Sequence, residues 1–391
     1  MYWGYPDRSR LPGPDREGVS LKILFTCGGT AGHINPAIAL ARLFQFRHQG
    51  CQVLFAGADN GMERTLVPHE GYELRTVHVN TIHRAWKWKD IKHNVMTVLT
   101  LPMARRQAGA ILEEFQPDLV VGTGGYASYP VVKEAARRGI PTAIHESNAV
   151  PGLTTKLLAK TVDRVMVGFE DSRRYYPHPD RVVVTGTPVR RDFFDHTRRE
   201  ARQALGFADD QPLVLSYWGS LGADVMNRYM ADFIQAEIRE GSPFHHIHGA
   251  GRNFAWLTGE LRGRGVALGE RVEIREYIYD MPLVMAAADL VVCRAGASTI
   301  SELTAIAKPC ILVPSPNVTN NHQEKNARVL EQHGAAVVLL EPECDGESLY
   351  AQAKGLLSER EKLTQMARNL SSLSVTDAAE EIYQTLLALL Q

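Results

Sequence analysis

The chain has 391 residues, 45% of them hydrophobic and 22% charged, which is typical of globular proteins and allows two domains of ordinary size. Its formal net charge of −1 gives no overall attraction to nucleic acid, and no apolar run approaches the roughly 20 residues of a membrane-spanning helix. The five cysteines are scattered without metal or redox spacing, which favours a reducing, cytosolic setting.

Residues 1–20 are polar, rich in Pro, Gly and Arg, and lack the apolar stretch of a signal peptide, so we expect either a flexible extension or an upstream translation start, outside the fold in both cases. After them, short apolar runs alternate with stretches of helical length, which is the pattern of parallel sheets with helices on both faces. The expected strands, in chain order, are residues 22–26, 52–56, 119–122, 142–144, 164–167, 182–185, 213–217, 272–275, 290–293, 310–313 and 337–340.

This series breaks near residues 186–190, where a charged stretch precedes a new strand, glycine loop and helix. We therefore expect two doubly wound α/β domains of similar size. Residues 377–391 carry apolar side chains at helical spacing and are expected to form an amphipathic helix.

Four loops of small residues each follow a predicted strand and precede a predicted helix, where exposed backbone amides can bind an anion or a sugar. The first loop fits neither the P-loop pattern nor G-x-G-x-x-G, which disfavours a dinucleotide cofactor. The chain has no Asp-x-Asp pair, so we expect no metal to hold a diphosphate. Loops in both domains suggest a cleft that binds a nucleotide diphosphate. The loops are Gly28-Gly29-Thr30-Ala31-Gly32-His33, Gly122 to Ser128, Trp218-Gly219-Ser220-Leu221-Gly222-Ala223, and Arg294 to Glu302.

Two of these loops contain residues with competing interpretations. Thr299 and Glu302 fit a Ser/Thr-x-x-Glu capping box, which needs no ligand, yet the same loop has the features of an anion site. His33 stands at the head of a helix, where it either acts as a catalytic group facing the carboxyl ends of the strands or is bonded to a nearby carbonyl.

Taken together, these motifs resemble the MurG family of bacterial transferases, which add N-acetylglucosamine to lipid I to make lipid II. Each piece is short, but their order and spacing are highly specific. The matching pieces are residues 28–33, Gly124-Gly125-Tyr126-Ala127-Ser128, His145-Glu146-Ser147-Asn148-Ala149-Val150-Pro151-Gly152, Gly186-Thr187-Pro188-Val189-Arg190, residues 219–223, residues 293–302, and Asn321-His322-Gln323-Glu324-Lys325-Asn326-Ala327.

The resemblance implies an α/β GT-B fold, in which two Rossmann-like domains enclose a deep cleft. Residues 21–186 would form the acceptor and membrane side, and residues 187–375 the donor side. Residues 376–391 would form a last helix that packs back on the first domain.

The resemblance also implies that the donor, UDP-N-acetylglucosamine, lies mainly on the second domain. The backbone of Ile278 would read uracil, Glu302 would bond the ribose hydroxyls, and Gln323 would bond the sugar. Further implied donor contacts are Arg190, Ser220, Gly296, Ala297, Ser298, Thr299, Ile300 and Ser301, joined from the first domain by Thr30, Ala31, Gly32 and Asn148.

The implied acceptor is a polyprenyl-diphosphate-linked sugar lying near His33, Tyr126 and the His145-Glu146 pair. Its hydroxyl is a poor nucleophile, so a base must remove the proton during an inverting displacement that needs no metal and no cofactor. His33 is the first candidate base because the unperturbed pKa of histidine lies near working pH. Glu146 is the second, and both residues have substrate positioning as the alternative role.

The second loop departs from the family pattern Gly-Gly-Ser-Gln-Gly-Ala, because Trp218 and Leu221 replace the first glycine and the glutamine. Ser147 and Tyr129 also replace residues common at their positions. These changes keep two alternatives open: a diverged enzyme acting on another lipid acceptor such as a diacylglycerol, and a non-catalytic scaffold that binds nucleotide sugars. Trp218 has the further alternative of facing the core.

Residues 82–106 interleave aromatic and basic residues beside an apolar face, notably Trp86, Lys87, Trp88 and Lys89. This pattern suits the headgroup boundary of an anionic bilayer, although a core helix with a basic rim has the same pattern. With a lipid-linked acceptor, we expect peripheral attachment at the cytoplasmic face of the cell membrane. Wall-synthesis proteins are possible partners, and nucleic acid is not.

Overall fold

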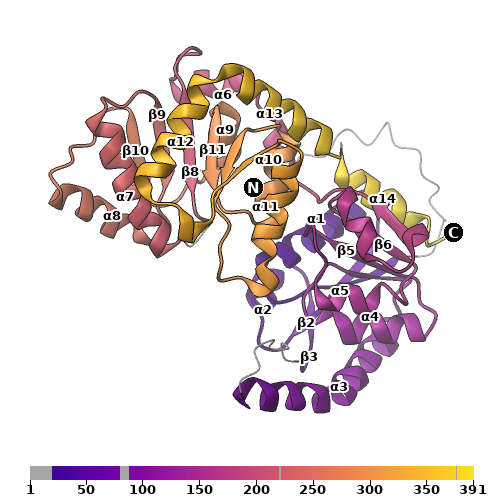
Figure 1. The fold of residues 1–391 in the computed structure, drawn as a ribbon. Helices are drawn as coiled ribbons and strands as arrows, with labels where there is room; N and C mark the ends of the chain where they lie inside the picture. Colours follow the sequence, from indigo (N-terminus) through magenta and orange to yellow (C-terminus); the bar gives the residue numbers. More distant parts are fainter. Residues whose placement is uncertain (1–19, 80–87, 220–221, 376) are drawn as a thin grey trace. The chain divides into compact units, whose positions relative to one another are not determined.

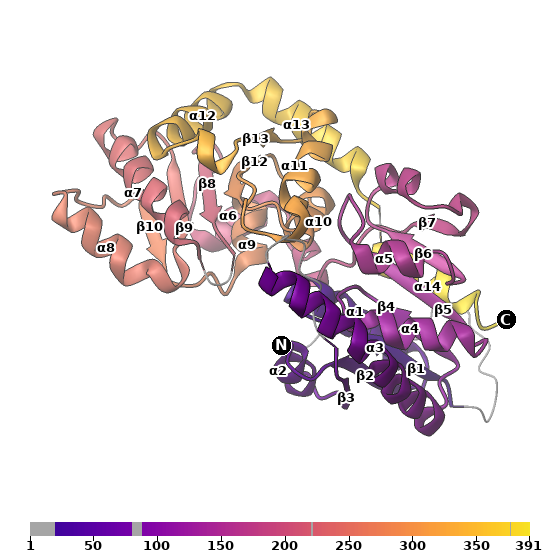
Figure 2. The ribbon, with the colours of Figure 1, turned by 60° about the horizontal axis from the view of Figure 1, so that its bottom comes forward.

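The computed structural model describes residues 20–79, 88–219, 222–375 and 377–391. The described chain folds into two compact units, unit 1 within Met1–Pro188 and Val375–Gln391, and unit 2 within Val189–Ser374 (Figure 1). Each unit contains one parallel sheet with helices packed on both faces (Figure 2). The expectation of two doubly wound α/β domains is confirmed.

Unit 1 is built on a seven-stranded sheet in the order β3-β2-β1-β4-β5-β6-β7, and every neighbouring pair is parallel. Its strands are β1 (Lys22–Thr26), β2 (Gln52–Ala58), β3 (Leu74–Val77), β4 (Leu119–Gly122), β5 (Thr142–Glu146), β6 (Arg164–Val167) and β7 (Val182–Val184). Its helices are α1 (Ala31–Arg47), α2 (Glu63–His69), α3 (Trp88–Phe115), α4 (Ser128–Arg137), α5 (Leu153–Leu158) and α14 (Ala378–Leu387), with the short 3-10 helices η2 (Glu170–Tyr175) and η3 (Pro179–Arg181).

Unit 2 repeats the plan with a six-stranded parallel sheet in the order β10-β9-β8-β11-β12-β13. Its strands are β8 (Leu213–Tyr217), β9 (His245–Gly249), β10 (Val272–Arg275), β11 (Leu290–Cys293), β12 (Cys310–Leu312) and β13 (Val337–Val338). Its helices are α6 (Arg198–Leu205), α7 (Asp224–Arg239), α8 (Phe254–Gly263), α9 (Met281–Ala287), α10 (Ala297–Ala305), α11 (His322–Gln332), α12 (Gly346–Ser358) and α13 (Arg360–Leu373), with the 3-10 helices η4 (Arg191–Phe194), η5 (Gly251–Asn253), η6 (Thr319–Asn321) and η7 (Glu341–Glu343).

All eleven predicted strands are present, with ends that differ by at most two residues, and two strands were missed. β3 is an edge strand whose residues Arg75 and Thr76 are exposed, so it has no continuous apolar run. β9 has the opposite character, because four of its five residues are buried although three of the five are histidines. The sequence signal failed there because these histidines find partners only in the folded unit.

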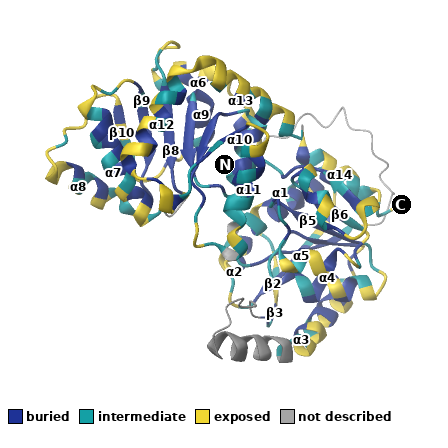
Figure 3. Cartoon of the chain, in the orientation of Figure 1, coloured by how far each residue is buried: buried dark blue, intermediate teal, exposed yellow. Residues whose placement is uncertain are grey.

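The apolar runs form strands because both faces of each sheet are covered, as the dark blue strands between exposed helix faces show (Figure 3). In β1, the side chains of Ile23 and Phe25 enter the core beneath α1 and α14, and Leu24 enters the core on the other face. α14 lies within the predicted helix 377–391 and packs on α1, where the side chains of His48 and Tyr383 lie 2.8 Å apart between Nε2 and Oη.

Each sheet has one place where the strand order reverses direction. In unit 1 it lies between β1 and β4, and in unit 2 between β8 and β11. In open parallel sheets, ligands bind outside the carboxyl ends of the strands at such a switch point. The four glycine-containing loops follow these four strands, so the topology brings them together in pairs.

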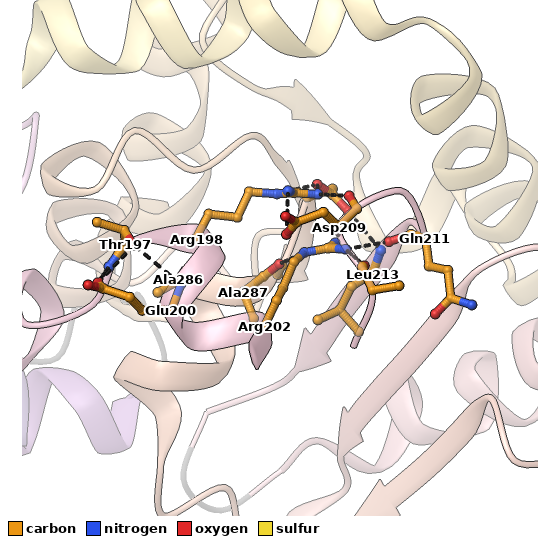
Figure 4. A network of polar contacts seen from close by, with 12 residues as sticks. Thr197, Arg198, Glu200, Arg202, Asp209, Gln211, Leu213, Ala286 and Ala287 are labelled. Carbon is orange, nitrogen blue, oxygen red and sulfur yellow. Dashed lines mark hydrogen bonds and ion pairs between the residues drawn. The ribbon is translucent and has the colours of Figure 1, made fainter. Parts of the chain in front are cut away.

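The amino edge of the unit 2 sheet carries a network of charged groups (Figure 4). Arg202 is fully buried and donates from Nη2 to Asp289 Oδ2 at 2.5 Å and from Nε to the Ala287 carbonyl at 3.0 Å. Lys308 donates from Nζ to the carbonyls of Ala286 and Ala288, and burial lowers its pKa to about 8. These cations pair with the last carbonyls of α9, which lack partners inside the helix.

Candidate active site

In unit 1, the loop after β1 and the loop after β4 are in backbone contact. A Cβ atom on Gly125 would lie 2.1 Å from the Gly28 carbonyl oxygen, and its φ of +84° also requires glycine. Helix α1 then begins at Ala31, with Thr30 as an N-cap whose side chain makes no capping bond. The first-turn amides of α1, including that of Gly32, therefore lie at the switch point without a side-chain cap.

His33 lies in the first turn of α1 and packs over Gly124, whose Cβ position would be 2.6 Å from His33 Cδ2. Its Nδ1 is 2.9 Å from the Gly28 carbonyl oxygen. A carbonyl only accepts hydrogen bonds, so Nδ1 carries the proton and the neutral ring has an unprotonated Nε2. The hydrogen bond to a nearby carbonyl, which was the alternative role expected for His33, is thus present. It leaves Nε2 able to accept a proton.

Glu146 ends β5 and is 5% exposed, with both carboxylate oxygens occupied. Oε1 accepts from the backbone and side-chain nitrogens of Asn148, and Oε2 accepts from Gly152 N at 3.0 Å and Thr155 Oγ1 at 2.7 Å. Four donors on one carboxylate are the arrangement of a group that fixes a loop. The geometry therefore favours the positioning role for Glu146 over the role of base.

His145, the neighbour of Glu146, is interior rather than exposed to a ligand. Its Nε2 lies 2.8 Å from the Gly186 carbonyl oxygen, and burial lowers the pKa of the ring. It links the end of β5 to the segment that follows β7. Tyr126 is partly exposed, donates to Asn60 Oδ1 at 3.1 Å, and has a pKa raised by burial and by the neighbouring Glu63.

Glu63 is a residue of this region that sequence reasoning missed. It is fully buried at the start of α2, where Oε2 accepts from Gly29 N at 3.1 Å and Oε1 accepts from Ala58 N at 2.7 Å. A buried carboxylate thus holds the first glycine loop against the end of β2. In the sequence Glu63 is an isolated glutamate two residues after Gly61, so no motif identified it.

In unit 2, the loop of residues 294–296 separates β11 from α10, which begins at Ala297 with Gly296 as its N-cap and no side-chain cap. Thr299 lies inside the helix, so the capping-box interpretation is wrong. The N–H of Ile300 already donates to Gly296 O at 2.9 Å and its side chain is in the core. Ser301 Oγ donates to Ala297 O at 2.9 Å. The Ile300 amide is therefore engaged within the helix. The expectation that residues 296–301 contact a ligand stays a prediction, with the amides of residues 297–299 as its candidates.

Glu302 lies in the second turn of α10 and is half-buried. In the described chain, no hydrogen bond or ion pair engages its carboxylate. Burial raises its pKa to about 7, while Arg190 opposes and Asp192 adds to this shift. A carboxylate that is desolvated without a partner costs stability, which is typical of a group reserved for a ligand.

The other predicted donor contacts lie around the same sheet edge. Gln323 on α11 accepts from Ser315 N at 2.9 Å through Oε1, so its amide nitrogen is the end left for a ligand. Ile278 is buried against Gly249, whose Cβ position would be 3.1 Å from Ile278 Cδ1. Arg190 is exposed, with its guanidinium 5.4 Å from the centroid of the Phe193 ring.

Two groups of predicted residues fall partly or wholly outside the described structure. Ser220 and Leu221 in the second loop lie outside it, and so do Trp86 and Lys87. Trp88 and Lys89 begin α3, whose backbone alone is described there. Trp218 is described, and its side chain is buried in the core of unit 2, so its predicted alternative of facing the core is confirmed.

The described ranges contain no candidate metal cluster and no candidate membrane-spanning helix. No group of three or more His, Cys, Asp or Glu residues in these ranges is arranged to hold a metal ion. Among the same residues, no helix has both the length and the hydrophobicity needed to cross a bilayer.

Known proteins match the chain over nearly its whole length. The glycosyltransferase family 28 N-terminal domain matches residues 23–167, and the family 28 C-terminal domain matches residues 214–382. A protein of Acetivibrio thermocellus named UDP-N-acetylglucosamine–N-acetylmuramyl-(pentapeptide) pyrophosphoryl-undecaprenol N-acetylglucosamine transferase is 43% identical over 364 residues, which cover 93% of this chain and 97% of that protein.

A Bacillus subtilis protein of the same name is 35% identical over 367 residues, covering 94% of this chain and 99% of that protein. The crystal structure of Acinetobacter baumannii MurG superimposes with a TM-score of 0.75 at 26% identity, covering 94% of this chain and 99% of that one. With two parallel-sheet Rossmann-like domains and matches to both family domains, the chain belongs to glycosyltransferase family 28 and has the GT-B fold.

Proposed function

We propose that this chain transfers N-acetylglucosamine from UDP-N-acetylglucosamine to lipid I, the undecaprenyl-diphospho-N-acetylmuramoyl-pentapeptide, and so forms lipid II for peptidoglycan. The observation that carries the proposal is 43% identity over nearly the full length of a relative named for this reaction. The site supports it in kind, because each sheet has uncapped helix amides at its switch point.

The proposed chemistry is a single displacement at the anomeric carbon. The acceptor hydroxyl oxygen forms a bond to that carbon as the bond to the UDP oxygen breaks, which inverts the configuration. His33 Nε2 takes the hydroxyl proton, since Nδ1 is held by the Gly28 carbonyl. The charge that develops on UDP is stabilised by the amides of residues 297–299 at the start of α10.

The remaining residues are proposed to hold the two substrates. Glu302 accepts hydrogen bonds from the ribose hydroxyls, because its carboxylate has no partner in the described chain. Gln323 donates from its amide nitrogen to the sugar. On the acceptor side, Glu146 and Glu63 fix the loops that carry Asn148 and His33.

The same proposal places the protein peripherally at the inner leaflet of the cell membrane, where a polyprenyl-linked acceptor is available. Trp86, Lys87, Trp88 and Lys89 are the proposed contacts with anionic lipid. Binding to vesicles with and without anionic lipid tests this part. Equal binding of the parent chain and a Trp86→Ala, Trp88→Ala double variant would contradict it.

The alternative acceptor and the scaffold hypothesis have less support. The case for divergence rested partly on Trp218, and that side chain packs in the core instead of displacing a ligand. A non-catalytic scaffold has no need of an unpartnered Glu302 or of a histidine with an unprotonated Nε2.

A transfer assay tests the proposed function. Radiolabelled UDP-N-acetylglucosamine with lipid I is compared with labelled UDP-glucose and diacylglycerol. We expect labelled lipid from the first pair alone. Labelled lipid from the second pair alone would overturn the proposal.

A further inference from the structure

Unit 2 contains a continuous chain of buried polar side chains between the sheet and α7. Ser216 on β8, His246 and His248 on β9, and Asn227 and Glu237 on α7 are all fully buried. Ser216 and the two histidines face the same side because β8 and β9 are parallel neighbours with Ser216 opposite His248. The proposed transfer mechanism uses none of these groups.

The links of this chain all have hydrogen-bond lengths. His246 Nδ1 lies 2.8 Å from Glu237 Oε2, and His246 Nε2 lies 2.8 Å from Ser216 Oγ. Ser216 Oγ lies 2.7 Å from His248 Nδ1, and His248 Nε2 lies 3.0 Å from Asn227 Oδ1. Asn227 Nδ2 donates at 3.0 Å to the backbone carbonyl of Ala250.

The Ala250 carbonyl, which ends the hydrogen-bond chain, fixes which atom is the donor in each hydrogen bond. Because Ala250 O only accepts, Asn227 must present its amide nitrogen there and its oxygen to His248. His248 Nε2 must then carry a proton. Burial lowers the pKa of His248 to about 3, so the ring is neutral and its Nδ1 is an acceptor.

The hydroxyl proton of Ser216 must therefore point to His248 Nδ1, which leaves Ser216 Oγ to accept from His246 Nε2. His246 Nε2 is thus protonated as well. The last link then needs a proton between His246 Nδ1 and Glu237 Oε2, on one atom or the other. The pair consequently holds one more proton than a neutral histidine beside a carboxylate.

The surroundings keep this proton away from water. The rings of Phe233 and Phe244 lie 5.1 and 6.3 Å from the His246 ring, and the Tyr350 ring packs on both phenylalanines. Tyr350 donates from Oη to Glu240 Oε2 at 2.9 Å, so its hydroxyl is engaged away from the Glu237–His246 pair. In this apolar environment, the loss of one hydrogen bond would leave a buried polar group unpaired. We therefore expect the hydrogen bonds of this series to form together.

The Asn227 end of the hydrogen-bond chain lies beside the loop proposed to bind the donor. Asn227 lies in the first turn of α7, and its own N–H donates to Ala223 O at 2.9 Å. Gly222 packs on the same carbonyl, since a Cβ atom there would lie 2.6 Å from Ala250 O. Gly249, which precedes that residue, packs under Ile278. Ala250 therefore joins α7, the second glycine loop and the end of β9.

We propose that Glu237, His246, Ser216, His248 and Asn227 form one directional hydrogen-bond chain that carries a buried proton on the Glu237–His246 pair and positions the start of α7 for the donor. These are positioning residues, because they act through Ala250 and α7 and not on the substrate. The donor part rests on the proposed function, whereas the proton arrangement does not.

Nitrogen-15 NMR of the full-length protein with labelled histidine tests the proton arrangement. Signals are assigned with His246→Gln and His248→Gln, and spectra are recorded from pH 6 to 9. We expect a proton on Nε2 of both rings and a bare Nδ1 on His248 throughout. A bare Nε2 on His246, or a proton on Nδ1 of His248, would overturn the direction of the chain.

Binding of UDP measured by calorimetry tests the positioning role. His248→Leu removes the links to Ser216 and Asn227, and we expect the Kd for UDP to rise about tenfold, as for one lost buried hydrogen bond. His248→Gln keeps a donor for Asn227 and should restore affinity to within about threefold. The control is His245→Gln, on the same strand but bonded to Gln211 at the amino edge.

The outcomes separate the two proposals. An unchanged Kd in His248→Leu, or an equal rise in His245→Gln, would overturn the positioning role. If His248→Leu fails to fold, the wild-type spectra still test the proton arrangement, and Ser216→Ala, which removes only the hydroxyl between the two histidines, replaces it in the calorimetry with the same expected direction. Wild-type protein that has the expected spectra but does not bind UDP would overturn the proposed function and leave the direction of the hydrogen-bond chain standing.

Discussion

Asp289 at the amino edge of the unit 2 sheet and Glu302 at its carboxyl edge are two carboxylates in opposite situations. At the amino edges, each of three aspartates that precede a strand accepts the first N–H of a neighbouring strand through Oδ2. These bonds run from Lys22 N to Asp118 at 2.8 Å, from Thr142 N to Asp163 at 2.8 Å, and from Leu213 N to Asp289 at 2.9 Å. Asp289 also forms ion pairs with Arg202 and Arg198, so both of its carboxylate oxygens have partners.

At the carboxyl edges the helices of the glycine loops begin without side-chain caps, and Glu302 has no hydrogen-bond or ion-pair partner among the residues that the structure describes. Charges with complete partners hold a fold together, whereas an unpaired desolvated carboxylate gains its partner only when a ligand arrives. The comparison therefore separates residues that serve stability from residues that serve binding, and substitutions at the two edges test it.

The largest effect is expected at the carboxyl edge of unit 1. His33→Ala removes the proposed base and should lower kcat roughly 10²- to 10⁴-fold, with the free energy of unfolding changed little. Steady-state transfer assays and urea unfolding measure the two quantities. His69→Ala, an exposed histidine on α2, is the control. Turnover by His33→Ala at the parent rate would remove the base assignment.

At the amino edge of unit 2 the expectation reverses. Arg202→Met leaves Asp289 without its buried partner and should lower the free energy of unfolding by about 3–5 kcal/mol, while the donor KM of the folded protein stays unchanged. Urea unfolding of this variant is compared with that of Arg199→Met, an exposed neighbour on α6. A loss no greater than in the control would show that the network contributes little to stability.

Glu302→Gln should raise the KM for UDP-N-acetylglucosamine about 10- to 100-fold, because the proposed charged acceptor for two ribose hydroxyls becomes a neutral amide. Stability should not fall, since no partner is left behind. Glu361→Gln on the exposed face of α13 is the control. A donor KM equal to that of the control would refute the ribose contact.

The same carboxyl predicts a smaller, pH-dependent effect on stability. Its folded pKa of about 7 lies above the usual value for glutamate, so the folded state binds the proton more tightly than the unfolded state. Its favourable contribution is complete below about pH 4.3 and is lost as pH rises to about 7. Wild-type stability should therefore fall relative to Glu302→Gln across this window. A constant difference would contradict the raised pKa.

The smallest effect is expected from a chelator. If helix amides stabilise the departing UDP, EDTA should leave the transfer rate within about twofold of its value without chelator. Added Mg²⁺ after dialysis is the matching control. A rate that disappears with EDTA and returns with Mg²⁺ would show that a metal shares this role.

The sequence predicted most of the fold because buried parallel strands read as apolar runs, as at Leu119–Gly122. It missed β9, where burial depends on partners from β8 and α7 that are distant in sequence. The loops at the switch points were predictable from small residues after strands. The capping box was wrong because α10 begins at Ala297, before Thr299, and a local pattern does not fix where a helix begins.

The residues that position the site loops and helices could not be predicted from the sequence, for a physical reason. Glu63 and His246 act through hydrogen bonds to groups that the fold brings together, and each appears in the sequence as an isolated polar residue. Glu146 matched a family motif, yet its four donors became visible only in the structure. The sequence showed which positions carry ionisable side chains. Only their hydrogen-bond partners in the structure indicated the role of each side chain.

The central claim is tested most directly by measuring lipid I glycosylation per folded molecule in Glu302→Gln and Arg202→Met side by side, with urea unfolding of both. We predict that Glu302→Gln loses donor affinity without any loss of stability. Arg202→Met should lose stability with unchanged activity per folded molecule. Equal loss of activity per folded molecule in the two variants would contradict the division between the edges.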